Sequence, residues 1–343
     1  MGKQIIALDA MGGDHGAPVT VGAAKLALDE FPGVELVLVG DQLQLQAEID
    51  KHGLSGNPRI RIHHASEVVA MDEMPVVALK KKKDSSMRVA INLVHDGSVH
   101  ACVSAGNTGA LMATSKFVLK TIRGISRPAI CTALPGIKGH THMLDLGANL
   151  ECEPENLLEF AVMGSVLAGS VEGIKNPTVG LLNIGSESVK GSESIKRASQ
   201  LIAESGLNYY GFVEGDDIYK GTVDVIVSDG FVGNVSLKTG EGLAALVNHV
   251  LQTEFKRNWL TKLAALLAMP VLSAVRRKLD PGRYNGATLL GLNGIVVKSH
   301  GGADTSSFLN AIRIASIEIE KDVPQRISSV IEKHFKQAEE AVT

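Results

Sequence analysis

Short apolar runs alternate with longer amphipathic stretches along most of this chain, and glycine or proline stands at many of the junctions. Runs rich in β-branched residues favour strands, whereas the longer stretches have the apolar spacing of helices. Strands are expected at residues 5–10, 34–40, 59–65, 99–106, 129–136, 142–149, 178–185, 209–215, 224–230 and 294–301. Helices are expected, among others, at 18–31, 108–122, 154–169, 193–205 and 240–258. This alternation predicts βα units and therefore an α/β fold, with a mostly parallel sheet covered on both faces.

The length and composition fit one large enzyme-sized domain. We expect the 343 residues to form a single α/β domain over residues 1–343. A net charge of −3 and an aromatic content of 4% provide little for nucleic-acid binding, so no nucleic-acid partner is expected. The three cysteines form no CxxC pair, and the first apolar run is broken by Asp9, unlike a signal peptide. These features fit a cytoplasmic protein.

Glycine stands beside Asn, Asp, Ser or Lys where many of the expected strands end. In open parallel sheets, ligands bind where the carboxyl ends of strands converge. The segments "SAGNTGA", "GSESVKGSES" and "VSDGFVGNVSLKT" each turn from a strand toward a helix, whose free amides attract an oxyanion. One such loop is usually only a connection, but three at one sheet edge favour an anion site. The polar candidates in these loops are Asn107, Thr108, Lys190, Asn234 and Lys238, with Gly233 at a turn.

Carboxylates also end expected strands, at Asp9, Asp145 and Asp229. Each could hold a glycine-rich loop through backbone amides, accept a proton, or ligate a metal, and loop holding is the commonest of these roles. Asp9 and Asp14 flank the first glycine pair and would repel an unassisted phosphate dianion. We therefore interpret "DAMGGDHG" as one wall of a cleft. No GxxxxGK[ST] is present and no GxGxxG opens the first βα unit, which weighs against ATP and dinucleotide binding.

The sequence shows no marked nucleophile or metal centre. No GxSxG elbow is present, and the acidic neighbours of Cys152 would raise the pKa of its thiol. His140 and His142 would lie on one face of a strand, as metal ligands sometimes do. Their segment offers no third ligand, so packing roles are favoured and no metal is expected. Catalysis would then depend on positioning and electrostatics, without a cofactor.

Two segments are suited to contact a partner. Lys80 to Lys83 form a run that is usually a solvated surface but could dock an acidic partner or phosphate.

Residues 255–283 place an uncharged stretch between basic flanks. This stretch is shorter than the ~20 residues that span a bilayer. Pro270 should bend or break this hairpin into two short helices. A core hairpin and an interfacial contact with membrane or an acidic carrier protein both remain open. The contact residues would be Lys256, Arg257, Leu263, Leu266, Leu267, Val271, Arg276, Arg277 and Lys278.

Several long motifs together carry a family resemblance. The segments "IALDAMGGDHGAP", "SAGNTGALMA", "LDLGANLECEPENLLEFAVMGSVLA", "GLLNIGSESVKG", "DVIVSDGFVGNVSLKT" and "YNGATLLGLNGIVVKSHG" resemble the bacterial phosphate acyltransferases of phospholipid synthesis. The resemblance implies a Rossmann-like αβα sandwich akin to phosphotransacetylase, with a protruding helical hairpin. It also implies a homodimer that associates peripherally with the inner face of the cell membrane.

The same resemblance implies a reaction and its partners. A long-chain fatty acyl group would pass from acyl-[acyl-carrier-protein] to inorganic phosphate, giving acyl phosphate for a membrane glycerol-3-phosphate acyltransferase and so for phosphatidic acid. Asp9 and Asp229 would orient loops or accept a proton, and Asn234 and Lys238 would lie near the reacting groups. Substrate and phosphate contacts would come from Gly12, Gly13, Asn107, Thr108, Asn149, Lys190, Gly233 and His300.

Two other functions are compatible with parts of this pattern. One is a nicotinamide-dependent dehydrogenase of related αβα architecture, which would need a metal–carboxylate cluster and an adenine-ribose site, and neither is evident. The other is a non-catalytic membrane scaffold that uses the hairpin alone. Loss of lipid synthesis on substitution of Asn234 or Lys238 would separate an enzyme from this scaffold.

Overall fold

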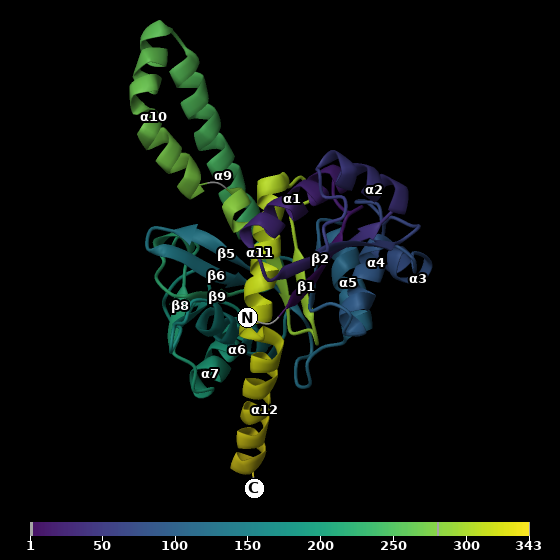
Figure 1. Ribbon diagram of the computed structural model, residues 1–343. Helices are drawn as coiled ribbons and strands as arrows, with labels where there is room; N and C mark the ends of the chain where they lie inside the picture. The colour runs from purple at the N-terminus through teal and green to yellow at the C-terminus, as the bar shows by residue number, and fades with distance from the viewer. Residues whose placement is uncertain (1–2, 280, 343) are drawn as a thin grey trace.

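The computed structural model contains one eleven-stranded sheet with helices on both faces (Figure 1). It describes the backbone of residues 3–279 and 281–342 and the side chains of residues 3–275 and 282–333. The strands are β1 (Gln4–Asp9), β2 (Val34–Gly40), β3 (Ile60–His64), β4 (Ala101–Ser104), β5 (Ala129–Gly136), β6 (Gly139–Leu144), β7 (Val179–Leu182), β8 (Tyr209–Val213), β9 (Val225–Val227), β10 (Ala287–Leu290) and β11 (Ile295–Lys298). Their order in the sheet is β3-β2-β1-β4-β11-β10-β5-β6-β9-β7-β8.

The helices mostly follow the strands in βα units, as the alternating sequence pattern predicts. They are α1 (Ala17–Glu30), α2 (Gln42–Lys51), α3 (Pro75–Lys81), α4 (Ser86–His95), α5 (Thr108–Leu119), α6 (Pro154–Val171), α7 (Glu193–Glu204), α8 (Asp217–Lys220), α9 (Gly230–Lys256), α10 (Trp259–Leu279), α11 (Thr305–Lys321) and α12 (Val323–Val342), with a 3₁₀ turn η1 (Pro281–Tyr284). The predicted αβα fold is confirmed.

The sheet consists of two parallel halves that run in opposite directions. The strands β3, β2, β1, β4 and β11 are parallel to one another, and so are β6, β9, β7 and β8. Between them, β10 pairs antiparallel with β11 and with β5, and β5 pairs antiparallel with β6. The expectation that all the glycine-rich loops share one edge is therefore wrong. β10 lies outside the expected strands because its four residues are too few for a clear pattern.

Each half of the sheet has a hydrophobic core on both faces, which explains the continuous apolar runs of its strands. In the first half, Ile6 and Leu8 of β1 pack with α1, α2 and α11, whereas Ala7 packs with α4 and α5 on the opposite face. In the second half, α6, α7 and α12 cover one face, while α8 and the start of α9 contribute to a smaller cluster on the other. The loops at the strand ends are thus held by two packed layers.

The helices α9 and α10 form a hairpin that projects from the sandwich (Figure 1). The helix α9 begins at Gly230, ten residues before the expected helix, so its first arm is longer than expected. The expectation that Pro270 divides the second arm is wrong, because Pro270 lies inside the continuous helix α10. On an exposed arm, water can satisfy the carbonyl that a helical proline leaves without its amide partner.

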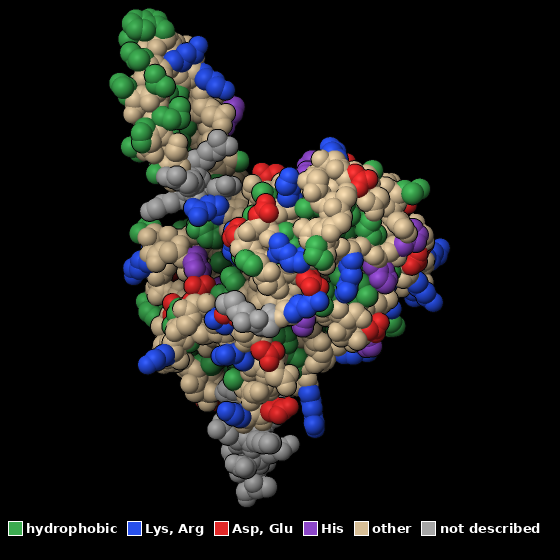
Figure 2. Space-filling view, viewed as in Figure 1, with side chains coloured by type: hydrophobic (Ala, Val, Ile, Leu, Met, Phe, Trp, Pro, Cys, Tyr) green, Lys and Arg blue, Asp and Glu red, His purple; other side chains and the backbone are tan. Residues whose placement is uncertain are grey.

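Apolar side chains lie exposed along this hairpin, and Figure 2 shows them gathered over its outer end. The exposed fractions of Leu266 and Leu267 are 65% and 77%, and Trp259 at the start of α10 is 72% exposed. Leu263 and Val271 are also exposed. Lys256 is exposed and Arg257 pairs with Glu254 at 3.3 Å, whereas the side chains of Arg276, Arg277 and Lys278 lie outside the described residues. Within the described part of the chain, no helix has the length and apolarity needed to span a bilayer.

Candidate active site

Three neighbouring parallel strands bring Asp9, Ser104 and Lys298 side by side. These residues end β1, β4 and β11, and the pairing register aligns Asp9 with Ser104 and Ser104 with Lys298. Their exposed fractions are 1%, 1% and 9%. The Ser104 Oγ donates to Asp9 Oδ2 at 2.6 Å and accepts from the Gly106 amide at 3.1 Å. The register of the sheet therefore places a carboxylate, a hydroxyl and an ammonium group at one edge.

Asp9 has the environment of a carboxyl group that can take up a proton. Burial raises its pKa, although hydrogen bonds, the strongest from Ser104, act in the opposite direction. The buried Oδ1 has no hydrogen-bond partner among the described residues. Unpaired buried polar atoms are rare in folded proteins and often mark a position that a ligand or water fills. Of the roles expected for Asp9, loop holding and proton acceptance both fit this geometry.

Lys298 is the buried cation of the site. Burial lowers the pKa of its ammonium group to about 8, whereas the charges of Asp9 and Asp14 favour the protonated form. The ammonium donates to the backbone carbonyls of Ala105, at 3.3 Å, and Ser299. A lysine with a lowered pKa, next to carboxylates at the end of a buried strand, is a candidate for a functional group.

The glycines of the first loop are required because the chain passes close to these groups. A Cβ on Gly12 would lie 2.5 Å from Asp9 Oδ2 and 2.8 Å from the Gly106 amide nitrogen. Gly13 has a φ of +84°, and a Cβ there would lie 2.9 Å from the Gly301 carbonyl oxygen. The loop therefore packs directly against the strand ends.

Asn107 and Thr108 start α5 beside this wall. The Asn107 Oδ1 accepts from the Ala110 amide at 2.9 Å, so it caps the helix. Its Nδ2 donates to the carbonyls of Met71 and Glu73, at 2.7 and 3.0 Å, and fixes the loop that leads into α3. These three hydrogen bonds already engage the Asn107 side chain. Thr108 is the first helical residue and is exposed, so the helix N-terminus remains open to a ligand.

A second cluster forms where β6 and β9 end. Asp145 follows β6 and is fully buried, and its Oδ1 accepts from the amides of Ile130 and Ala148 at 3.0 and 3.1 Å. Its Oδ2 accepts from the backbone and side-chain nitrogens of Asn149, at 2.7 and 2.9 Å. The Asn149 carbonyl in turn accepts from the Gly230 amide at 2.7 Å. Asp145 therefore holds a loop, and Asn149 connects that loop to α9.

Asp229 positions the helix that carries two predicted site residues. Its Oδ1 accepts from the Val232 amide at 2.7 Å, which caps α9. The sequence suggested that Gly233 lies in the loop before the helix. It lies instead inside α9, in the first turn of that helix. A Cβ there would lie 1.9 Å from the Asp145 carbonyl oxygen, so only glycine allows this approach. Asn234 is exposed beside Gly147.

Lys238 links the two clusters electrostatically. It lies four residues after Asn234, so both side chains occupy one face of α9. Its ammonium pairs with Glu241 at 2.8 Å, and it is close enough to Lys298 for its charge to lower the pKa of that residue further. Two cations whose charges act on each other favour an anion in their neighbourhood.

Two predicted contact residues lie in separate arrangements. Lys190 is exposed and pairs with Glu187 at 2.8 Å within the loop after β7, and no hydrogen bond among the described residues joins it to either cluster. His300 is exposed next to Lys298 in the loop after β11, and its Nδ1 accepts from the Gly302 amide at 3.1 Å. His300 thus lies at the edge of the first cluster, whereas the hydrogen bonds and the ion pair of Lys190 stay within its own loop.

Lys298 and Ser104 are absent from the residues predicted by sequence, although both stand in quoted strand-end segments. Their signal is a polar side chain as the last residue of an otherwise apolar strand, "VVK" and "CVS". That pattern identifies a site only when the order of the strands in the sheet is known, because serine and lysine also end many strands that have no functional site.

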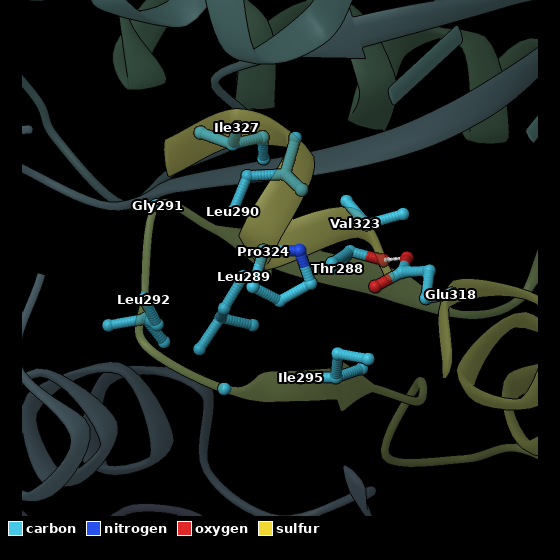
Figure 3. Close-up of a pocket in the computed structure, with 11 residues that line it drawn as sticks. Thr288, Leu289, Leu290, Gly291, Leu292, Ile295, Glu318, Val323, Pro324 and Ile327 are labelled. Carbon is cyan, nitrogen blue, oxygen red and sulfur yellow. Dashed lines mark hydrogen bonds between the residues drawn. The ribbon is translucent and has the colours of Figure 1, made fainter. Parts of the chain in front are cut away.

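A small pocket at the junction of α11 and α12 is separate from these clusters (Figure 3). It is lined mainly by apolar side chains, with Glu318 as its charged member. Glu318 is 2% exposed and accepts a hydrogen bond from Thr288, and burial raises its pKa to about 8. The carboxyl group is therefore largely protonated at neutral pH and acts as a buried neutral group.

The chain has an α/β fold that is similar to the fold of solved phosphotransacetylases. The EutD phosphotransacetylase from Staphylococcus aureus matches with a TM-score of 0.60 at 17% identity, over 92% of this chain and 94% of that one. A phosphotransacetylase from Streptococcus pyogenes matches with a TM-score of 0.62 at 16% identity, over 93% and 94% of the two chains. A 4-hydroxythreonine-4-phosphate dehydrogenase from Klebsiella pneumoniae also matches, with a TM-score of 0.52 at 15% identity over 94% and 99%. At such identities the likeness concerns the fold alone.

The sequence relatives are more specific. Residues 5–326 match the model of a family described as "Fatty acid synthesis protein". The phosphate acyltransferase of Nitrosococcus oceani is 59% identical over 95% of this chain and 96% of its own length. That of Methylococcus capsulatus is 58% identical over 94% and 95%. The chain belongs to the phosphate acyltransferase family and is an acyltransferase enzyme of lipid synthesis.

Proposed function

We propose that this enzyme transfers a long-chain fatty acyl group from the thioester of acyl-[acyl-carrier-protein] to inorganic phosphate, giving acyl phosphate for phospholipid synthesis. The observation that supports this most is the pair Asp9 and Lys298 at neighbouring strand ends, with Lys238 of α9 close enough for its charge to act on Lys298. The two cations provide a place for phosphate, and the family supplies the acyl-transfer chemistry.

In this reaction a phosphate oxygen attacks the thioester carbonyl carbon. The carbon–sulfur bond then breaks, and the proton of the phosphate hydroxyl ends on the thiol of the carrier. Lys298 would hold the attacking dianion and the oxyanion. Its pKa of about 8 is close to the ~8.5 of a free thiol, so a proton can pass from the ammonium to the leaving thiolate with little energetic cost.

The remaining residues would organise the cleft. Asp9 would keep Lys298 in place and take up a proton as phosphate reacts. Asp229 would act indirectly, since it caps the helix that presents Asn234 and Lys238. Gly12 and the start of α5 at Thr108 would line the phosphate side, because amide groups at a helix N-terminus attract anions.

We further propose that the exposed apolar hairpin contacts the inner face of the cell membrane and that the enzyme works there as a homodimer. A membrane glycerol-3-phosphate acyltransferase would take the product. The apolar side chains of α10 and the nearby basic residues Lys256 and Arg257 have the composition of an interfacial anchor. The run Lys80 to Lys83 on and after α3 would receive the acidic carrier protein.

The reaction can be tested directly with palmitoyl-carrier protein, phosphate and hydroxylamine, which traps acyl phosphate as a hydroxamate. We expect phosphate-dependent release of free carrier by the wild-type enzyme. Asn234→Ala and Lys238→Ala should each lower turnover, by about tenfold or more if they contact the reacting groups. Hydroxylamine also reacts directly with the thioester, so the product formed without enzyme is subtracted, and enzyme-dependent product that does not depend on phosphate would contradict the proposal.

The membrane contact has its own test. Leu266→Glu should reduce flotation with anionic liposomes, because a charge replaces an apolar side chain at the outer arm. Leu43→Glu is a matched control, because Leu43 is 82% exposed on α2, away from the hairpin. Equal flotation of wild type and Leu266→Glu would exclude this part of α10 as an anchor.

A further inference from the structure

Two histidines and one glutamate converge on the second half of the sheet, apart from the strand-end clusters. His140 and His142 lie on one face of β6, and Glu172 is the C-cap residue directly after α6. The His140 Nε2 lies 3.0 Å from Glu172 Oε1, and the His142 Nε2 lies 3.5 Å from the same oxygen. One ligand atom from each residue lies within 4.8 Å of the other two. The third ligand that the β6 segment lacks thus comes from a helix thirty residues further along the chain.

His142 is the unusual member of this cluster. It is 7% exposed, and neither ring nitrogen has a hydrogen-bond partner among the described residues. Its Nε2 nevertheless points toward the Glu172 carboxylate, at a distance longer than that of a hydrogen bond. A buried imidazole without a partner costs free energy, and a ligand between the two groups would remove that cost.

The spacing of the three groups fits a tetrahedral metal ion. Donor atoms about 2.0–2.1 Å from a tetrahedral zinc are about 3.3 Å from each other. The distances from Glu172 Oε1 to the Nε2 atoms of His140 and His142, 3.0 and 3.5 Å, lie on either side of this value. Two imidazoles and one carboxylate also bind zinc and similar borderline cations better than they bind magnesium or calcium, which favour oxygen donors.

We propose that His140, His142 and Glu172 form a binding site for a divalent transition-metal ion, with zinc as the best fit. The ion would join the start of β6 to the end of α6, with water in the fourth position. The C-terminal end of α6 favours a cation, because the helix dipole is negative there. The helix has eighteen residues and no basic side chain in its last turn that could take this place. Asp145 is three residues beyond His142, about 10 Å along the strand, so this site is separate from the proposed phosphate chemistry.

A metal-free arrangement is the competing explanation. In it, protonated histidines would pair with Glu172, and the hydrogen bond between His140 and Glu172 does lower the pKa of Glu172 and raise that of His140. The two arrangements respond oppositely to pH. Metal binding strengthens from pH 6 to pH 8 because protons no longer compete for the histidines, whereas the ion pairs weaken as the histidines lose their charge.

The test uses the full-length untagged protein, freed of metal with a chelator and titrated with Zn²⁺. We expect one ion per chain, a higher melting temperature in the presence of Zn²⁺, and tighter binding at pH 8 than at pH 6. Co²⁺ in place of Zn²⁺ should give the intense visible absorption of a tetrahedral complex. His140→Gln and Glu172→Gln should each weaken Zn²⁺ binding by at least about tenfold and abolish the rise in melting temperature.

His95→Gln is the matched control, because His95 is an exposed histidine that pairs with Asp96. It should leave Zn²⁺ binding unchanged. Both His140 and Glu172 are partly exposed, so their variants should fold even where His142→Gln does not. Wild-type binding no tighter than that of His140→Gln, or a melting temperature indifferent to Zn²⁺ at pH 8, would overturn the proposal.

Discussion

Replacement of Lys298 by methionine tests the proposed role of the buried ammonium. Methionine keeps an unbranched side chain of similar length but removes the charge. Removal of one preorganised donor from a reacting oxyanion typically costs about 10²–10³ in turnover, or about 2.7–4 kcal/mol. We expect Lys298→Met to lower phosphate-dependent kcat/KM by that factor, measured as hydroxamate formed from palmitoyl-carrier protein.

The pH profile makes this prediction more specific. With a pKa of about 8, Lys298 is about nine-tenths protonated at pH 7 and about one-tenth protonated at pH 9. The kcat/KM expressed per phosphate dianion should therefore fall about tenfold between these pH values. In Lys298→Arg the guanidinium stays charged, so the remaining activity should be nearly constant over the same range.

Stability distinguishes a catalytic loss from misfolding. Removal of one of two neighbouring buried charges usually destabilises because it leaves the other uncompensated, but the raised pKa of Asp9 lets that carboxyl group take up a proton. Lys298→Met should therefore lose less than the ~3–5 kcal/mol typical of such a removal and stay folded under assay conditions. Lys220→Met, at an exposed lysine that pairs with Asp216, should leave both activity and melting unchanged. The reasoning fails if Lys298→Met keeps more than about a tenth of wild-type kcat/KM, against the loss expected for such a donor.

Two further predictions concern stability. Burial raises the pKa of Glu318 to about 8, so the folded state holds a proton that the unfolded chain releases above its ordinary pKa. This group should therefore reduce the free energy of unfolding by about 1.4 kcal/mol per pH unit from about pH 4.5 to 8, and Glu318→Gln should remove that slope in urea melts. Gly233→Ala should destabilise by about 1–3 kcal/mol and lower activity, because its Cβ would meet the Asp145 carbonyl at 1.9 Å. Gly242→Ala in the same helix meets nothing within 4 Å and should stabilise by up to about 1 kcal/mol, and similar melting of both variants would contradict this reading.

Much of the secondary structure follows from local sequence pattern. The strands at Val34–Gly40 and Ala129–Gly136 coincide with the predicted segments, because short runs of mostly apolar residues between glycines and prolines favour strands. The start of α9 does not follow from local pattern, since the two glycines of "GFVGN" disfavour a helix. The Asp229 cap and the close approach of Gly233 to Asp145 stabilise that turn, and both depend on contacts with the loop after β6.

The sequence by itself determined the α/β class, the family and the glycine-rich character of the strand ends, because these depend on neighbouring residues and on long motifs. Only the tertiary structure decided which of these residues meet. The order of the strands places Lys298 from the end of the chain beside Asp9 from its start, and it turns Asn107 and Asp145 inward to hold loops. It also brings Glu172 to the two histidines of β6. Such encounters arise from the pairing of strands and the packing of helices between distant segments, and no local spacing in the chain encodes them.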